Sequence, residues 1–165
     1  MLSLGSNMAL AARTPRDILA RAIDRLGTRC AVHAVSPLYE TDAWGNTDQP
    51  NFNNCVVICE TNLAPERLLD AVQQVEHEFH RIRTIHWGPR TLDVDIANLY
   101  DAATGQEIPV HTDRLTVPHP CAHERDFVLV PWADVAPDDL LGAVPVRDLL
   151  AAPTPGVRLV AEEWR

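Results

Sequence analysis

The segment from Leu92 to Ile96 alternates strictly between apolar and acidic residues, and this alternation constrains the fold more than any other feature of the chain. A period of two predicts a β-strand with one buried face and one polar face. Leu92, Val94 and Ile96 then face a core. Asp93 and Asp95 share the opposite face, with their Cα atoms about 7 Å apart. Two such carboxylates repel each other unless a cation joins them, so the pair is a candidate metal site; an acidic strand facing solvent is the simpler alternative.

Three arginines, Arg81, Arg83 and Arg90, precede the acid pair in a segment that also contains Trp87 and Gly88. The chain has no lysine, so all 14 of its basic residues are arginines. A P-loop lysine, a Schiff-base lysine and a Ser-Lys dyad are therefore excluded, and guanidinium groups must bind any phosphate through bidentate hydrogen bonds. Arginines beside a metal site can neutralise a transferring phosphoryl group, and a loop containing glycine can close over a substrate. A solvated run of charge is the alternative.

The length and composition predict one domain, residues 1–165, in which 136–165 is a Pro-rich peripheral extension. A hydrophobic content of 46% is enough to form a core, and a net charge of −9 argues against a nucleic-acid partner. No apolar run approaches the ~20 residues that span a bilayer, and the N-terminal residues do not resemble a signal peptide. The four cysteines have no C-x-x-C spacing, which favours free thiols. We expect a cytoplasmic monomer without a membrane partner.

Hydrophobic periodicity predicts two amphipathic helices. The first begins at Thr14-Pro15, as an N-cap followed by a proline, and ends at Gly27. The second begins at Pro65. Their apolar stripes are Ile18, Leu19, Ala22, Ile23 and Leu26 in the first helix, and Leu68, Val72, Val75 and Phe79 in the second. Gln73, Glu76 and His80 line a stripe beside the second of these.

Strands are predicted at residues 1–4, 30–39, 52–61 and 92–99. The core order is therefore β-α-β-β-α-β. This order indicates an α+β, ferredoxin-like sandwich, with an antiparallel sheet and two helices on one of its faces. Short helices are expected within 125–135 and near 146–150, and the tail after Pro137 is only weakly patterned.

Two further groups of residues carry competing interpretations. His119 to His123 contains two histidines and a cysteine, but its prolines and close spacing make a tetrahedral zinc site awkward. His119 fits better as a phosphate-contacting group, although a lone histidine is more often structural. Phe52 and Phe127 lie beside predicted turns and could sandwich a flat heterocycle, although most such residues belong to the core.

Several motifs resemble those of the 6-hydroxymethyl-7,8-dihydropterin pyrophosphokinase family. They are W-G-P-R-T-L-D-V-D-I at 87–96, R-L-T-V-P-H at 114–119, D-Q-P-N-F-N-N at 48–54, S-P-L-Y-E-T at 36–41 and L-G-S-N at 4–7. They occur in the family's order, up to about Pro137. The resemblance implies an ATP-dependent diphosphotransferase of folate biosynthesis. This enzyme transfers pyrophosphate from ATP to the hydroxymethyl group of 6-hydroxymethyl-7,8-dihydropterin and releases AMP.

The resemblance also implies roles for individual residues. Asp93 and Asp95 would hold two Mg²⁺ ions between the ATP phosphates and the attacking hydroxyl, and Arg81, Arg90 and Asp95 would be catalytic. The pterin would be bound by Thr41, Asp42, Trp44, Phe52, Asn54 and Phe127. The nucleotide and its phosphates would be bound by Gln73, Glu76, Arg83, Trp87, Arg90, Arg114, Thr116, His119 and Arg125.

The chain departs from the family pattern at a few positions. Phe52 and Pro120 each stand where tyrosine is common in the family, and the segment 81–87 is one residue shorter than in better-known members. Two other functions remain open at this point. One is a catalytically silent, ferredoxin-like nucleotide-binding domain. The other is a different D-x-D metal enzyme, such as a glycosyl transferase or a nuclease, although a nuclease fits a net charge of −9 poorly.

Overall fold

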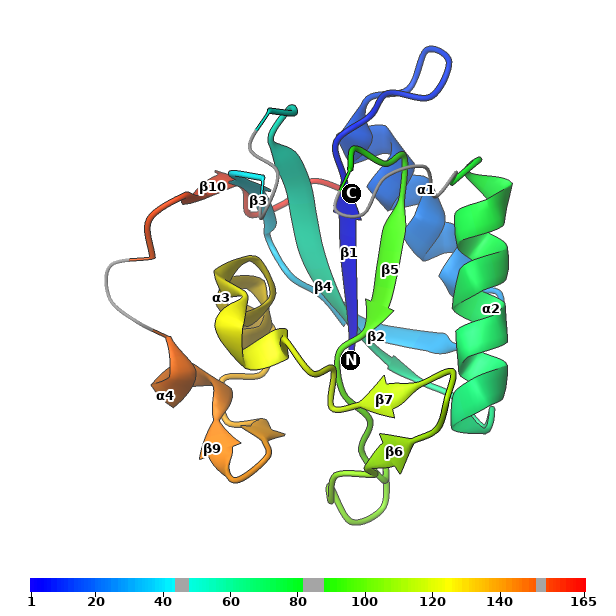
Figure 1. Ribbon diagram of the computed structural model, residues 1–165, viewed down its shortest axis with the longest axis vertical. Coiled ribbons are helices and arrows are strands. Elements are labelled where there is room, and N and C mark those ends of the chain that lie inside the picture. The colour runs from blue at the N-terminus through cyan, green and yellow to red at the C-terminus, as the bar shows by residue number, and fades with distance from the viewer. Residues whose placement is uncertain (44–47, 82–87, 151–153) are drawn as a thin grey trace.

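The computed structural model describes residues 1–43, 48–81, 88–150 and 154–165 (Figure 1). The elements of its first part are β1 (Leu2–Ser6), α1 (Pro15–Leu26), β2 (Ala31–Val35), β3 (Leu38–Thr41), β4 (Phe52–Glu60), α2 (Pro65–Glu78) and β5 (Asp93–Ile96). There follow β6 (Val110–His111), β7 (Thr116–Val117), η1 (Ala122–Glu124), α3 (Asp126–Val135), β8 (Leu140–Leu141), β9 (Val144–Pro145), α4 (Val146–Leu149) and β10 (Val157–Ala161). None of these helices is long and apolar enough to cross a membrane.

The described residues form a six-stranded sheet in the order β10-β3-β4-β1-β5, with β2 also paired to β4. All of its pairings are antiparallel, and the nine-residue β4 is shared by β1, β2 and β3. The predicted α+β, ferredoxin-like sandwich is therefore confirmed. The acid pair of β5 and the N-terminal strand lie next to each other, because β1 runs between β4 and β5.

Helices α1 and α2 begin where the sequence predicts. Thr14 caps α1 through a capping box with Asp17: the Asp17 N–H donates to the Thr14 hydroxyl, and the Thr14 N–H donates to the Asp17 carboxylate. Pro15 and Pro65 take the first helical turn, where a missing N–H removes no helical hydrogen bond. Each helix turns its predicted apolar stripe inward, and these side chains are 6% exposed or less.

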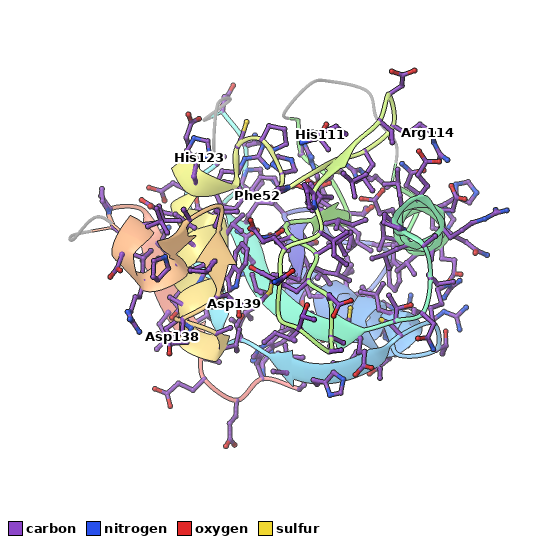
Figure 2. All side chains as sticks on the ribbon, turned by 90° about the horizontal axis from the view of Figure 1, so that it is seen from below. Phe52, His111, Arg114, His123, Asp138 and Asp139 are labelled. Atoms are coloured by element: carbon purple, nitrogen blue, oxygen red, sulfur yellow. The ribbon has the colours of Figure 1, made fainter. Side chains whose placement is uncertain are left out.

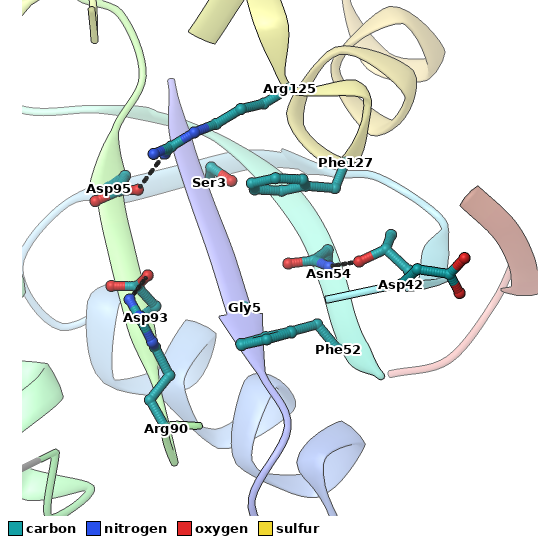
Figure 3. Close-up of a pocket in the computed structure, with 11 residues that line it drawn as sticks. Ser3, Gly5, Asp42, Phe52, Asn54, Arg90, Asp93, Asp95, Arg125 and Phe127 are labelled. Atoms are coloured by element: carbon teal, nitrogen blue, oxygen red, sulfur yellow. Dashed lines mark hydrogen bonds and ion pairs between the residues drawn. The ribbon is translucent and has the colours of Figure 1, made fainter. Parts of the chain in front are cut away.

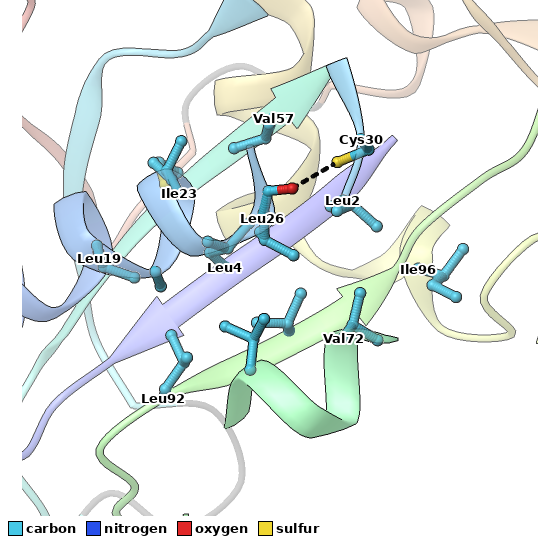
Figure 4. Packing of buried hydrophobic residues seen from close by; sticks show 14 of the residues in the cluster. Leu2, Leu4, Leu19, Ile23, Leu26, Cys30, Val57, Val72, Leu92 and Ile96 are labelled. Carbon is cyan, nitrogen blue, oxygen red and sulfur yellow. Dashed lines mark hydrogen bonds between the residues drawn. The ribbon is translucent and has the colours of Figure 1, made fainter. Parts of the chain in front are cut away.

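The main core lies between these helices and one face of the sheet (Figure 4). Leu2 and Leu4 of β1 project into it from the centre of the sheet and are fully buried. Val94 and Ile96 join them from β5, each 4% exposed. Burial of these alternate residues turns Asp93 and Asp95 toward the other face, as the period of two predicts.

Helix α3 covers part of that other face and forms a second core. Val128, Leu129 and the fully buried Trp132 pack there against Val56 of β4. The Trp132 Nε1–H donates to Asp139 Oδ2 at 3.1 Å, which satisfies the one polar atom of this indole. Helix α3 covers only part of the face. Its N-terminal end lies beside the acid pair, where Arg125 contacts Asp95.

Two segments differ from the prediction. The single strand expected at 30–39 is divided into β2 and β3 by Ser36-Pro37, because proline supplies no N–H for the ladder. The tail after Pro137 contributes β10, which pairs with β3 and extends the sheet. Trp164 follows β10 and is 7% exposed, with its Nε1–H donating to Ser36 O at 3.0 Å. The C-terminal residues are therefore built into the core.

Candidate active site

The acid pair lies at the edge of a pocket over the centre of the sheet (Figure 3). In the register between β1 and β5, Ser3 faces Asp95 and Gly5 faces Asp93. The pocket lies on the α3 side of the sheet, opposite α1 and α2. It is lined by Ser3, Gly5, Thr41, Asp42, Phe52, Asn54, Arg90, Asp93, Asp95, Arg125 and Phe127.

Asp93 is flanked by two of the predicted arginines. Arg81 Nη2 lies 2.5 Å from Asp93 Oδ1, and Arg90 Nη1 lies 2.5 Å from Asp93 Oδ2. All three side chains are at most 22% exposed, so solvent screens these charges less than at the surface. The structure therefore places two guanidinium groups and one carboxylate at the same point.

Glu76 of α2 contacts both β5 and one of the arginines that flank Asp93. Its Oε1 accepts a hydrogen bond from the backbone N–H of Val94 at 2.8 Å, and it also pairs with Arg81. The side chain of Glu76 is only 5% exposed. One buried carboxylate thus fixes both the strand that carries the acids and an arginine that contacts Asp93.

Asp95 is paired with groups from the segment that leads into α3. Arg125 Nη1 lies 3.3 Å from Asp95 Oδ2, and His119 Nε2 lies 4.0 Å from the same oxygen. Burial, together with the nearby charge of Asp93, raises the pKa of Asp95 above its ordinary value. Burial lowers the pKa of His119, and the charge of Asp95 acts in the opposite direction.

The other end of the pocket is aromatic. The rings of Phe52 and Phe127 stand on opposite sides of the space above Asn54 (Figure 3). The Arg125 guanidinium lies 5.6 Å from the centroid of the Phe127 ring, within the range of a cation–π contact. Asn54 is 4% exposed, and its Nδ2 donates to Thr41 Oγ1 at 2.6 Å. This end offers two ring faces and a fixed polar edge.

Asn7 joins the two ends through backbone contacts. Its Oδ1 accepts from the Arg90 N–H at 2.8 Å, and its Nδ2 donates to Pro50 O at 2.9 Å and Gln49 Oε1 at 3.1 Å. Its own N–H donates to Arg90 O. Asn7 therefore ties the arginine segment to the loop that precedes Phe52.

Most of the predicted site residues meet in or beside this pocket, and a few do not. Gln73 is exposed on α2, and Thr116 in β7 is not among the lining residues. Arg114 Nη2 lies 2.6 Å from Asp70 Oδ1 on α2, away from Phe52 (Figure 2). Trp44, Arg83 and Trp87 lie outside the described residues.

Three contributors were not assigned from the sequence: Ser3, Gly5 and Asn7. A signal for Gly5 was present, because a glycine inside a strand often marks a close approach by another group. A Cβ built at this position would lie 2.7 Å from Asn54 Oδ1. Asn7 is part of the L-G-S-N motif at 4–7, but its contacts with distant loops cannot be read from that motif. Ser3 carries no comparable local signal, since its role depends on strand pairing.

The acid pair suits a hard divalent cation. Within the described ranges no cluster of three or more His, Cys, Asp or Glu side chains is arranged to hold a metal. Asp93 and Asp95 therefore offer two carboxylates rather than a closed cage, and magnesium commonly binds one or two carboxylates and completes its shell with water and phosphate oxygens. Asp93 Oδ1 is buried without an aligned hydrogen bond among these residues, although the Arg81 charge lies close to it. Both Asp93 oxygens thus face arginines in this structure, and a cation bound there would share the carboxylate with them.

Comparison with known proteins identifies the family. The model of the 7,8-dihydro-6-hydroxymethylpterin-pyrophosphokinase (HPPK) family matches residues 1–137. The 2-amino-4-hydroxy-6-hydroxymethyldihydropteridine pyrophosphokinase of Pseudomonas aeruginosa is 46% identical over 140 residues, which cover 83% of this chain and 80% of that protein. The protein of the same name from Mycobacterium tuberculosis is 38% identical over 169 aligned positions, which cover 98% of this chain and 82% of that protein.

A structural relative supports the same fold. The crystal structure of Plasmodium falciparum HPPK-DHPS superposes with a TM-score of 0.60 at 16% identity and covers 90% of this chain and 42% of that one. At this identity the likeness shows the fold alone. Together with the sequence matches, it leads to the conclusion that the chain belongs to the 7,8-dihydro-6-hydroxymethylpterin-pyrophosphokinase family and is an ATP-dependent pyrophosphokinase of folate biosynthesis, as the motifs predicted.

Proposed function

We propose that the pocket binds the ATP phosphates at its acidic end and 6-hydroxymethyl-7,8-dihydropterin at its aromatic end, and that pyrophosphate passes between them. The observation that carries this proposal is the presence of both ends in one pocket. Asp93 and Asp95 stand on β5, Asn54 on β4 and Thr41 at the end of β3, all in one sheet. A polyphosphate and a flat ring can therefore lie side by side over β1.

The aromatic end suits a pterin. Phe52 and Phe127 offer ring faces on both sides of a flat bicycle, and such stacking adds about 0.5–1.5 kcal/mol per pair beyond buried area. Asn54 sits between the rings with its amide held by Thr41, so its carbonyl oxygen is turned to accept a hydrogen bond from the ring's edge. We assign Asp42 and the backbone beside it to the same wall.

The acidic end suits a triphosphate with magnesium. Two Mg²⁺ ions at Asp93 and Asp95 would neutralise phosphate charge and make the hydroxymethyl group of the pterin easier to deprotonate. Arg81 and Arg90 already stand beside Asp93, where guanidinium groups can donate to the oxygens of the migrating group. Arg125 and His119 hold the corresponding position beside Asp95. Such chemistry needs positioning and positive charge rather than a protein nucleophile.

Other expectations extend this proposal. We assign Glu76 to the support of Arg81, and we keep Gln73, Arg83, Trp87, Arg114 and Thr116 as contacts for the nucleotide. The chain would act as a single domain, 1–165, and as a cytoplasmic monomer without nucleic-acid or membrane partners. The net charge of −9 supports the absence of a nucleic-acid partner. A silent nucleotide-binding domain is not favoured by the family match.

The test is release of AMP from ATP, Mg²⁺ and 6-hydroxymethyl-7,8-dihydropterin. Asp95→Asn keeps the size of the side chain and removes its charge, and we expect kcat to fall by about 10²–10³-fold, as when one electrostatic group is removed from a preorganised site. Asp113→Asn, at an exposed aspartate, is the matched control and should keep normal turnover. Circular dichroism and thermal melting should show the same fold in both variants. Near-normal turnover in Asp95→Asn would remove the basis for the assignment of the metal site.

A further inference from the structure

The C-terminal strand β10 lies beside the part of the pocket that Thr41 and Asp42 line, here called the pterin wall. This strand follows residue 137, where the family match ends. It lies beside β3 (Figure 1) and pairs with it in antiparallel orientation. In this register Val157 is opposite Thr41 and Arg158 is opposite Glu40. Strand β3 has only four residues and pairs with β4 on its other side. Without β10, the outer N–H and C=O groups of β3 would form an open sheet edge. The position of Thr41 therefore depends on strands on both sides.

Gly156 makes the closest contact with this wall. Its carbonyl oxygen accepts the backbone N–H of Asp42 at 3.0 Å. Its φ of +85° lies in the region that glycine adopts readily and other residues rarely adopt. A Cβ on Gly156 would lie 3.0 Å from Asp42 Oδ2 and 3.5 Å from Asp42 Cβ. Glycine at this position thus permits both the backbone angle and the approach to Asp42.

Arg158 limits the ability of Asp42 to move away. Its Nη2 lies 2.7 Å from Asp42 Oδ1 and 3.0 Å from Glu40 Oε1. One guanidinium therefore joins the side chains of the residues before and after Thr41. These side chains are 43–63% exposed, so the pairs orient Asp42 more than they stabilise the fold. The other end of the strand is fixed by the buried Trp164, whose carbonyl oxygen accepts from Arg16 Nη2 at 3.1 Å.

We propose that Gly156 and Arg158 are positioning residues for the pterin, because they fix Thr41 and Asp42 through the backbone and side-chain contacts of β10. Thr41 in turn accepts a hydrogen bond from the Asn54 amide. A displacement of Thr41 would therefore also move Asn54, the residue that we assign to the edge of the pterin ring. The inference rests on the proposed pterin site. It predicts that the C-terminal strand affects affinity for the pterin and does not affect the binding of ATP phosphates at the acidic end of the pocket.

The test compares two glycine variants in the full-length chain. Gly156→Ala introduces a Cβ at positive φ and against Asp42. Gly142→Ala introduces a Cβ at a similar φ of +67°, with nothing within 4 Å, and serves as the matched control. We expect Gly156→Ala to raise the KM for the pterin about three- to tenfold, which corresponds to a loss of about 0.6–1.4 kcal/mol in binding free energy. Its KM for ATP and its kcat should stay within about twofold of the parent chain, and Gly142→Ala should change none of the three.

Arg158→Gln provides a second variant that adds no backbone strain. We expect a smaller rise in the KM for the pterin, because its ion pairs are half-exposed. If Gly156→Ala and Gly142→Ala have the same KM for the pterin, the inference is wrong. It is also wrong if Gly156→Ala raises both KM values and lowers kcat together, since that pattern reports a general disturbance. Absence of AMP release by the parent chain would instead refute the proposed function.

Discussion

Replacement of Glu76 tests how the acid strand and its arginines are held. Glu76→Ala removes the acceptor of the buried Val94 N–H and one of the carboxylates paired with Arg81. An unsatisfied buried N–H costs about 1–3 kcal/mol, and breaking a buried ion pair costs about 3–5 kcal/mol when no other partner remains. Arg81 keeps Asp93, so we expect a loss in unfolding free energy of about 3 kcal/mol.

Glu76→Gln separates the two contributions. The amide oxygen can still accept from the Val94 N–H, while the charge opposite Arg81 is lost. We expect a smaller loss of about 1–2 kcal/mol, the difference between a hydrogen bond to a charged group and one to a neutral group. The assay is urea unfolding followed by circular dichroism, with the slope checked for two-state behaviour.

The matched control is Gln74→Ala, at an exposed position of the same helix, which should stay within about 0.5 kcal/mol of the parent chain. An Ala variant of Glu76 as stable as this control would show that the carboxylate does not support β5. Equal losses in the Ala and Gln variants would show that the bond to Val94 contributes nothing measurable.

Two further predictions concern Gly5 and Cys59. Gly5→Ala should lower the melting temperature and weaken pterin binding, because its Cβ would meet Asn54 Oδ1 at 2.7 Å and overpacking of this kind costs about 1–3 kcal/mol; unchanged binding measured by calorimetry would contradict the contact. The neighbouring Cys30 lowers the pKa of the Cys59 thiol from 9.0 to about 7, against the opposite effect of burial. The rate of Cys59 alkylation should therefore rise with pH through a midpoint near 7 and then level off, and Cys30→Ala should move that midpoint upward; a midpoint near 9.0 in the parent chain would refute the interaction.

The elements with strong local signals could be predicted from the sequence. The Thr14-Pro15 start needs only a side-chain cap and a proline in the first turn, and both act within three residues. The alternation around Asp93 and Asp95 needs only the pleat of a strand to place both acids on one face. These features are local, so the chain displays them without knowledge of the neighbouring strands.

Strand β10 shows why other elements could not be predicted. Leu159 and Val160 are adjacent apolar residues and both are about half-exposed, at 51% and 49%, so the strand has no alternating pattern. It forms because β3 offers an edge more than a hundred residues earlier in the chain and because Trp164 is buried beyond it. Both causes are non-local.

The second helix shows the limit of a stripe argument for the site. The sequence pattern predicts that Gln73 and Glu76 share one stripe, yet Glu76 is buried and Gln73 is exposed. Three residues along a helix correspond to a rotation that leaves these side chains about 60° apart around the axis. Glu76 falls at the margin of the buried arc and Gln73 beyond it. The pairing of Arg114 with Asp70, 44 residues away in sequence, is another contact that no local pattern reveals.

The strand order has a consequence for ligands of this fold. β5 and β3 carry the two walls of the pocket, and β1 and β4 lie between them. Adjacent strands are about 4.8 Å apart, so three such steps separate the walls by about 14 Å. Backbone hydrogen bonds between the strands, rather than side chains, therefore set the distance between the two walls. A molecule that reaches both walls must extend over that span, and no exchange of a single side chain can shorten it.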